Sequence, residues 1–256
     1  MSELRQRLYV IVFVPLFTLT PTVCAFPLST EDTGTQGLGK SKIELTSERE
    51  VEREQGAREI TATHEIALAH GLLEHFDASI AHTYRTLREQ AAQGDSVRAQ
   101  GVGDIKIGMK WRFYERDGLS FGLKGRFTAP TADAARKLGN GKPTQSFDAI
   151  ASYATEPWAL HFNLGYSHNR NTRQQREHLG RASTALVWRL DGRWKVMADV
   201  GVARNKSQSS KQILAFAGAG LAYAWTPQLK FELGIKQGLT PAETDFTGLV
   251  GMSYRF

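Results

Sequence analysis

The side chains that come nearest to a catalytic centre are a histidine and a serine on one predicted strand. His161 and Ser167 fall on the same face of residues 158–167, and a serine hydrolase needs such a nucleophile beside a general base. Six residues of extended chain would separate the two side chains by about 20 Å. A serine from another strand could still meet His161, so a hydrolase is kept as the third hypothesis, behind two non-catalytic ones given below. The expectation is that the protein is not an enzyme.

Histidines and glycine-containing segments predict neither a metal site nor a nucleotide site. The histidines lack a compact spacing with carboxylates or thiols that would build a metal site, so interface and loop roles are predicted for them, with no metal and no cofactor. Residues 138–142 lack the spacing of a phosphate-binding loop and precede Pro143, which indicates a turn. The histidines are His64, His70, His75, His82, His161, His168 and His178.

Basic side chains recur at alternate positions and could together favour anions. On the predicted inward face they outnumber the acidic side chains, and a positive excess beside a low-dielectric wall favours anionic solutes. The alternative is that these charges pair across strands and fill a narrow barrel, and both readings stay open. The predicted pore-lining residues are Lys106, Lys110, Arg112, Lys124, Arg126, Arg181, Arg189, Lys195, Lys230 and Lys236.

These side chains are positioned by segments in which apolar and polar residues alternate, as they do in strands with two different faces. In residues 158–167 the side chains of Trp158, Leu160 and Phe162 share one face, while His161 and Asn163 share the other. The same split occurs in residues 105–114, 120–127, 194–202 and 229–236. In a transmembrane barrel one face meets lipid and the other a polar lumen. A soluble β-sandwich also alternates and is the competing fold.

The spacing of turn residues favours the barrel, because barrels alternate short turns at one end with longer loops at the other. Short turns are predicted at residues 73–74, 117–118, 156–157, 191–192 and 226–227. Longer polar connections are predicted at residues 89–100, 130–145, 171–178 and 205–210. A sandwich with Greek-key crossings is not expected to keep this rhythm.

Aromatic residues support the same interpretation, because amphipathic aromatic side chains collect at membrane interfaces. Each tryptophan lies within about six residues of a predicted short turn on the apolar face, as a girdle requires. The predicted girdle is Trp111, Trp158, Trp188, Trp194 and Trp225. The last strand ends on an aromatic residue and resembles the signal that the barrel-assembly machinery recognises, here Met252, Tyr254 and Phe256.

The sequence therefore predicts an all-β protein: a transmembrane antiparallel up-and-down β-barrel of about twelve strands, with both termini periplasmic. The first strand, residues 42–50, is the least clear, because glutamates interrupt its alternation. The next two strands, residues 60–72 and 76–87, place His64 and His82 on the outward face. A subunit contact, a position at the membrane interface or a slip of parity would each explain these outward imidazoles.

Residues 1–25 form a predicted signal peptide, in which arginines precede an apolar core and a small-residue pattern ends at Ala25. Cys24, the only cysteine, would leave with this signal; acylation of Cys24 is less favoured, because Val23 fits that processing poorly. Residues 26–40 are predicted as a periplasmic N-terminal extension and residues 41–256 as the barrel. No later apolar run reaches about 18 residues, which excludes a helical membrane protein.

Several segments together resemble the family of outer-membrane transporters associated with the meta-pathway of phenol degradation. The resemblance covers nearly the whole mature chain and is carried by TEDTGTQGLGK at 30–40, HGLLEHFD at 70–77, GDIKIGMKWRF at 103–113, PAETD at 241–245 and YRF at 254–256. It implies a β-barrel with a role in the uptake of aromatic or related compounds. It implies no set of catalytic residues.

The leading hypothesis is an outer-membrane channel for the passive passage of small solutes, either aromatic or anionic. The alternative is a structural or partner-binding barrel with a plugged lumen. The predicted partners are the lipid bilayer and lipopolysaccharide of the cell outer membrane, the barrel-assembly machinery and a small-molecule solute. The net charge of +6 does not predict nucleic acid as a partner, because an exported protein rarely meets it.

Overall fold

A computed structural model describes residues 28–54, 57–90 and 96–256, so the predicted signal peptide lies outside the described residues. Among the residues described, no helix is long and apolar enough to cross a membrane. The strands are β1 (Ser41–Glu54), β2 (Ala57–Leu73), β3 (Phe76–Gln90), β4 (Ser96–Val102), β5 (Ile105–Arg116), β6 (Leu119–Ala129), β7 (Thr144–Thr155), β8 (Trp158–His168), β9 (His178–Arg189), β10 (Trp194–Arg204), β11 (Ile213–Ala224), β12 (Leu229–Gly238) and β13 (Phe246–Arg255).

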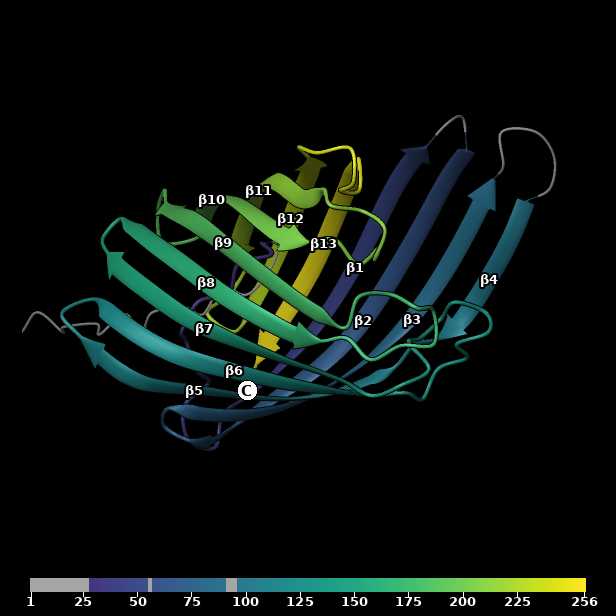
Figure 1. The fold of residues 1–256 in the computed structure, drawn as a ribbon. Helices are drawn as coiled ribbons and strands as arrows, with labels where there is room; N and C mark the ends of the chain where they lie inside the picture. The colour runs from purple at the N-terminus through teal and green to yellow at the C-terminus, as the bar shows by residue number, and fades with distance from the viewer. Residues whose placement is uncertain (1–27, 55–56, 91–95) are drawn as a thin grey trace, which may run out of the picture.

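The strands form a closed antiparallel ring (Figure 1). Each strand from β5 to β13 pairs with the next, β13 pairs with β1, and β1, β2 and β3 follow in order. β4 and β5 together make one strand of the wall, because β4 pairs with residues 84–90 of β3 and β5 pairs with residues 76–81. The ring therefore has twelve wall strands, which confirms the predicted all-β barrel.

Alternation gives the barrel wall two different faces. On β8, Leu160 and Phe162 are each 49% exposed on the outside, whereas His161 and Asn163 are buried inside. Apolar side chains face outward around the ring, and most inward side chains are polar, apart from a buried inward cluster of Val187, Met197 and Ala222. An outward surface of this composition requires an apolar solvent such as a bilayer.

Short turns and long loops separate to the two ends of the barrel, which we call the short-turn end and the long-loop end. The short turns lie at residues 74–75, 117–118, 156–157, 190–193 and 225–228, and long loops lie at residues 130–143, 169–177, 205–212 and 239–245. Both ends of the wall meet at the short-turn end, where the N–H of Ser41 donates to the carbonyl of Phe256 at 2.8 Å. The predicted alternation of turn lengths is therefore present from β5 to β13, whereas only two residues separate β1 from β2 at the long-loop end.

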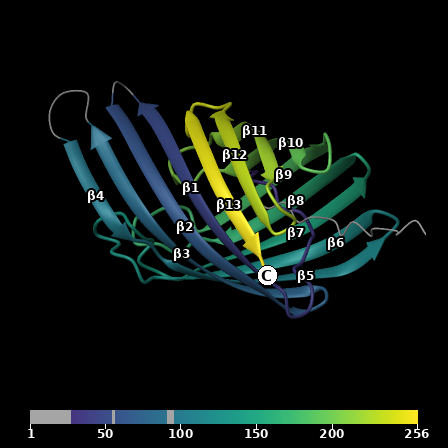
Figure 2. The ribbon, with the colours of Figure 1, turned by 180° about the vertical axis from the view of Figure 1, so that it is seen from behind.

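One predicted loop was wrong, because residues 89–100 are mostly strand. β3 continues to Gln90 and β4 begins at Ser96. These polar residues belong to the part of β1–β4 that rises beyond the neighbouring strands at the long-loop end (Figures 1 and 2). Beyond the part of the wall that faces lipid, a strand needs no apolar face, and its hydropathy pattern then resembles that of a loop.

The first three strands are longer than predicted and keep the predicted parity. β1 extends over Ser41–Glu54 and not only over residues 42–50. His64 and His82 are both exposed on the outward face, which excludes a slip of parity. Glu48 and Glu50 face inward, so the glutamates that blur the alternation of β1 belong to the lumen side.

The described residues before β1 turn back into the ring (Figure 1); the sequence predicted residues 26–40 as a periplasmic N-terminal extension. We call the described part, residues 28–40, the N-terminal segment; it is the purple coil within the ring (Figure 1). At its end Gly39 donates its N–H to the carbonyl of Gly71 at 2.8 Å. A Cβ on Gly71 would come within 1.8 Å of the Gly37 carbonyl oxygen, so only glycine allows this approach.

We expect Gly71→Ala to lower the free energy of unfolding by about 1–3 kcal/mol, the usual cost of an added methyl group in a packed site. Guanidinium titration of the protein in lipid vesicles measures this change. Gly180→Ala is the matched control, because a Cβ there meets nothing within 4 Å. Equal stabilities of the two variants would contradict the close approach of the N-terminal segment to β2.

Candidate functional site: the barrel lumen

The space inside the ring is divided into three cavities. The outer cavity, at the long-loop end, has a volume of about 520 Å³, the middle cavity about 420 Å³ and the inner cavity, at the short-turn end, about 260 Å³. Lys106 and Arg126 line both the outer and the middle cavity, while Gly34 of the N-terminal segment lines both the middle and the inner cavity. The cavities therefore follow one another, and the segment lies between the second and the third.

The N-terminal segment crosses the lumen without regular secondary structure and is held by its backbone N–H groups. These groups donate to inward side chains of several strands: Ser29 to Asp199 at 2.8 Å, Glu31 to Asn163 at 2.8 Å, Thr33 to Ser152 at 3.2 Å and Gln36 to Asp77 at 3.0 Å. The acceptors belong to β10, β8, β7 and β3, so the segment reaches from one side of the wall to the other. Thr30 and Thr33 are only 1% and 4% exposed, as expected of a chain packed inside the barrel.

Carboxylates of the N-terminal segment neutralise lysines of the wall. Lys110 of β5 and Lys124 of β6 are direct partners in the strand register, and two like charges so placed repel each other. The Glu31 carboxylate pairs with Lys124 and also with Lys110 at 3.3 Å, and Asp32 pairs with Lys110 at 3.3 Å. Burial opposes ionisation of Glu31, but the two lysines outweigh it and hold the pKa of its carboxyl well below its usual range.

The predicted pore-lining residues lie on the inward side of the wall. Nine of the ten line one of the three cavities, and Lys230 lies on the inward face of β12. Most have carboxylate partners: Lys106 with Glu65 at 2.5 Å, Arg181 with Asp148 at 2.5 Å, Arg112 with Glu115 at 3.3 Å, Lys236 with Glu243 at 3.5 Å, and Arg189 with Glu156. Pairing thus accounts for much of the positive charge in the middle and inner cavities, and for Lys106 and Arg181 in the outer cavity.

The outer cavity keeps a positive surplus. Six cationic side chains and one carboxylate, Asp104, line it; Lys106 and Arg181 pair with Glu65 and Asp148, which leaves Arg85, Arg126, Arg204 and Lys206 against Asp104. Among the residues that the structure describes, Arg85 and Arg126 form no ion pair with a carboxylate. The oxygens of Asp104 accept the backbone N–H groups of Ala132 at 2.9 Å and Asn140 at 3.0 Å, so its charge also serves to hold the loop 130–143.

Some lining residues could not be found from strand parity. Arg204 ends β10 and Lys206 follows in the loop, where alternation no longer decides which way a side chain points. Glu31 and Asp32 precede the first strand, and their contacts with β5 and β6 depend on tertiary packing. The only sequence signal for them is the acidic pair itself, ahead of a barrel with an excess of inward cations.

A serine does meet His161, although it is not Ser167. Ser152 of β7 is the register partner of His161 on β8, and its Oγ lies 2.8 Å from the histidine Nδ1. A serine and a histidine at this distance can act as nucleophile and base. Here the Ser152 Oγ also accepts the N–H of Thr33 at 3.2 Å, and both side chains are buried, so the pair anchors the N-terminal segment to the wall.

Aromatic side chains gather outside the barrel near the short-turn end. The five predicted girdle tryptophans are all exposed on the outside. Trp158 stacks on Trp188 with ring centroids 5.0 Å apart, and Trp194 lies 4.4 Å from Tyr223. Of the predicted assembly signal, Tyr254 and Phe256 are exposed and stack at 6.1 Å, while Met252 is half-buried on the same face.

The sequence profile of one family matches residues 30–256, nearly the whole described chain, and that family is described as "Putative MetA-pathway of phenol degradation". The chain belongs to this family. The curated proteins include no match to it. The resemblance inferred from the five sequence segments is therefore confirmed over the entire barrel.

Solved structures with a similar fold include a channel, a porin and a translocator domain. An outer membrane channel from Pseudomonas putida F1 shares 13% identity at a TM-score of 0.72, with 90% of this chain and all (100%) of that chain covered. The KdgM porin shares 8% identity at a TM-score of 0.58, covering 84% and 99%. The translocator domain of autotransporter NalP from Neisseria meningitidis shares 13% at 0.54, covering 88% and 91%. At these identities the likeness concerns the fold.

We expect Glu31→Gln to loosen the N-terminal segment and raise the single-channel conductance. Removing one partner of a buried ion pair costs about 3–5 kcal/mol, and the lower end applies because a fifth of the Glu31 side chain (20%) is exposed to the cavities. Recording in planar bilayers measures the conductance. Asp117→Asn, in an exposed turn, is the control and should leave it unchanged; an unchanged conductance in Glu31→Gln would contradict the role given to this carboxylate.

The effect of Glu31 should not depend on pH within the neutral range. A carboxyl whose pKa is lower when bound than when released stabilises the bound form fully above its ordinary pKa of about 4.3 and loses this effect only as the pH falls through the lowered value. The ratio of the Glu31→Gln conductance to the wild-type conductance should thus be equal at about pH 8 and about pH 5. Convergence of the two conductances on going to the lower pH would show that Glu31 is already protonated there.

Proposed function

We propose that this protein is an outer-membrane channel that passes small anionic solutes by diffusion. The observation that carries the proposal is the charge of the outer cavity, where four cations besides the paired Lys106 and Arg181 stand against one carboxylate. Field lines are confined by a low-dielectric wall, so this charge concentrates anions at the long-loop end. The predicted periplasmic position of both termini would place that end at the cell exterior. An anion would therefore meet the positive cavity first.

The middle cavity favours passage over tight binding. Its lining includes Lys42, Lys106, Lys110, Lys124, Arg126 and Lys236 together with Glu31, Glu44, Glu48, Glu65, Asp77 and Asp199. The formal charges of these groups balance, so the middle cavity presents no second site of strong attraction. A channel conducts when entry is favourable and exit is not prevented, and the fall in positive charge along the lumen meets this condition.

The charge of the cavities indicates the chemical class of the solute more than any site for an aromatic ring does. No aromatic side chain is found among the residues described as lining the outer and middle cavities. The description of the family refers to phenol degradation, and aromatic carboxylates combine that chemistry with a negative charge. We therefore propose small carboxylates, including aromatic ones, as solutes.

A barrel with a plugged lumen remains the second candidate, favoured by the N-terminal segment between the middle and inner cavities. In that case the outer cavity would bind anions without passing them. Planar-bilayer recording separates the two candidates, because a tight seal without conductance steps removes the channel.

Charge reversal in the outer cavity should change ion selectivity. We expect Arg126→Glu to lower the anion-over-cation permeability ratio several-fold, since local potentials of several kT depend on such charges. The reversal potential in a salt gradient measures the ratio. Arg116→Glu at an exposed short turn, where the side chain is 76% exposed, is the control. Equal ratios in wild type and Arg126→Glu would contradict an anion filter at this position.

Two solutes of similar shape and different charge test whether charge decides which solute passes. Benzoate and benzamide have similar size and the same ring, and we expect benzoate to cross proteoliposome membranes faster than benzamide. Arg126→Glu should reduce this difference. A protein-dependent flux that is larger for benzamide than for benzoate, after subtraction of the flux into protein-free liposomes, would contradict the proposed selectivity even if the protein conducts ions.

A further inference from the structure

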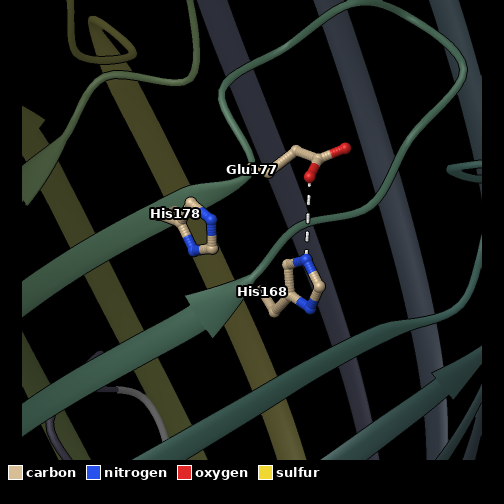
Figure 3. A group of neighbouring side chains, drawn as sticks. All are labelled: His168, Glu177 and His178. Atoms are coloured by element: carbon tan, nitrogen blue, oxygen red, sulfur yellow. Dashed lines mark ion pairs between the residues drawn. The ribbon is translucent and has the colours of Figure 1, made fainter.

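Two histidines face each other where the β8–β9 hairpin opens into its loop. His168 ends β8 and His178 begins β9, and the strand register pairs them directly. Their rings lie parallel, with centroids 5.3 Å apart and planes inclined by 2°. Figure 3 shows both rings together with the Glu177 side chain, which points toward His168.

Glu177 supplies a third donor of a kind that metal ions use. Its Oε2 lies 3.7 Å from the Nε2 of His168, and one ligand atom from each of the three residues lies within 4.8 Å of the others. Ligand atoms around a tetrahedral Zn²⁺ are about 3.4 Å apart, given metal–ligand distances near 2.1 Å. The proposed site requires side-chain rotations that bring these atoms together to that separation. The side chains of His168 and Glu177 are 35% and 51% exposed, so an ion from the medium can reach them.

Tyr166 holds one of the imidazoles in a suitable orientation. Its hydroxyl shares a hydrogen bond of 2.6 Å with the Nδ1 of His178, and the two rings stack with centroids 6.0 Å apart. With Nδ1 engaged, the Nε2 of His178 is the nitrogen left to bind a metal. Metal-binding histidines usually have such a partner on the other ring nitrogen, because it fixes the ring.

We propose that His168, Glu177 and His178 form a Zn²⁺ site on the outward surface of the barrel at the long-loop end. Two imidazoles and one carboxylate are a donor set that suits Zn²⁺, whereas Ca²⁺ and Mg²⁺ require oxygen ligands. Three protein ligands leave a fourth position for water. The site is separate from the lumen and from the proposed passage of anions.

The bound ion would fix a loop that shapes the mouth of the outer cavity. Glu177 and both histidines lie at the base of the loop 169–177, and Asn169 lines the outer cavity. Within this loop Thr172 donates its N–H to the carbonyl of Asn140 at 3.1 Å, and Arg173 donates to the carbonyl of Gly139 at 3.0 Å. The loop thus contacts the loop 130–143, so a metal at its base would hold both loops.

Isothermal titration with ZnCl₂ tests the proposal, using the protein purified in detergent without a polyhistidine tag and stripped of metal by a chelator. We expect one Zn²⁺ per chain. His168→Ala and His178→Ala should each weaken binding more than tenfold, and Tyr166→Phe should weaken it about tenfold because it removes the orienting hydrogen bond. His70→Ala is the matched control; this histidine pairs with Ser41 at the other end of the wall, and its loss should leave the affinity unchanged.

A further variant distinguishes the loss of a metal ligand from misfolding of the histidine variants. Glu177→Gln changes an exposed loop side chain, keeps the shape of the side chain and should weaken Zn²⁺ binding while the heat-modifiable gel mobility of the barrel stays at the wild-type value. Loss of binding in the three ligand variants with retention in His70→Ala supports the site. The proposal is overturned if wild type binds no Zn²⁺, or if the His168→Ala, His178→Ala double variant binds it as tightly as wild type.

Discussion

The structure depends on one constraint: a closed ring of strands divides its side chains between an apolar exterior and a polar interior. Backbone pairing closes the ring except along β4, which pairs with β3 alone and rises beyond the neighbouring strands, and the period of two then sends every second residue inward. The outward face of β8 and β12 shows the apolar half of this division, with Leu160, Leu233 and Ile235 exposed. The charged side chains therefore face the lumen, where each charge needs a partner, water or a counter-ion.

The N-terminal segment meets this need in one half of the lumen and leaves the other half charged. Register places Lys110 beside Lys124, and the segment brings Glu31 and Asp32 to them. Beyond the segment, toward the long loops, the cationic residues of the outer cavity outnumber its one carboxylate. The same charges therefore have two roles that depend on depth: with a carboxylate they hold the segment, and without one they attract anions.

The sequence predicted the features that alternate locally and missed those that depend on distant contacts. The alternation of side chains along a strand was enough to place His161 and Arg126 on the inward face and His64 on the outward face, because a strand fixes the direction of each side chain. Parity could not reveal Ser152 beside His161, since the two are joined by register across a turn and not by spacing along one strand. His168 and His178 show the same limit: ten positions apart in sequence, they are direct partners in the sheet. Residues 89–100 were predicted to be a loop because a strand outside the membrane no longer needs to alternate apolar and polar side chains.

A disulfide between the N-terminal segment and the wall tests the central claim, that this segment lies in the lumen and limits the passage. Thr33 and Ser120 have hydroxyl oxygens 2.6 Å apart, and the mature chain is predicted to contain no other cysteine. In the Thr33→Cys, Ser120→Cys double variant a disulfide should form on oxidation, and single-channel recording should show a low, steady conductance that rises and fluctuates when the disulfide is reduced. Failure of the disulfide to form in the folded barrel, or equal conductance before and after reduction, would contradict the account.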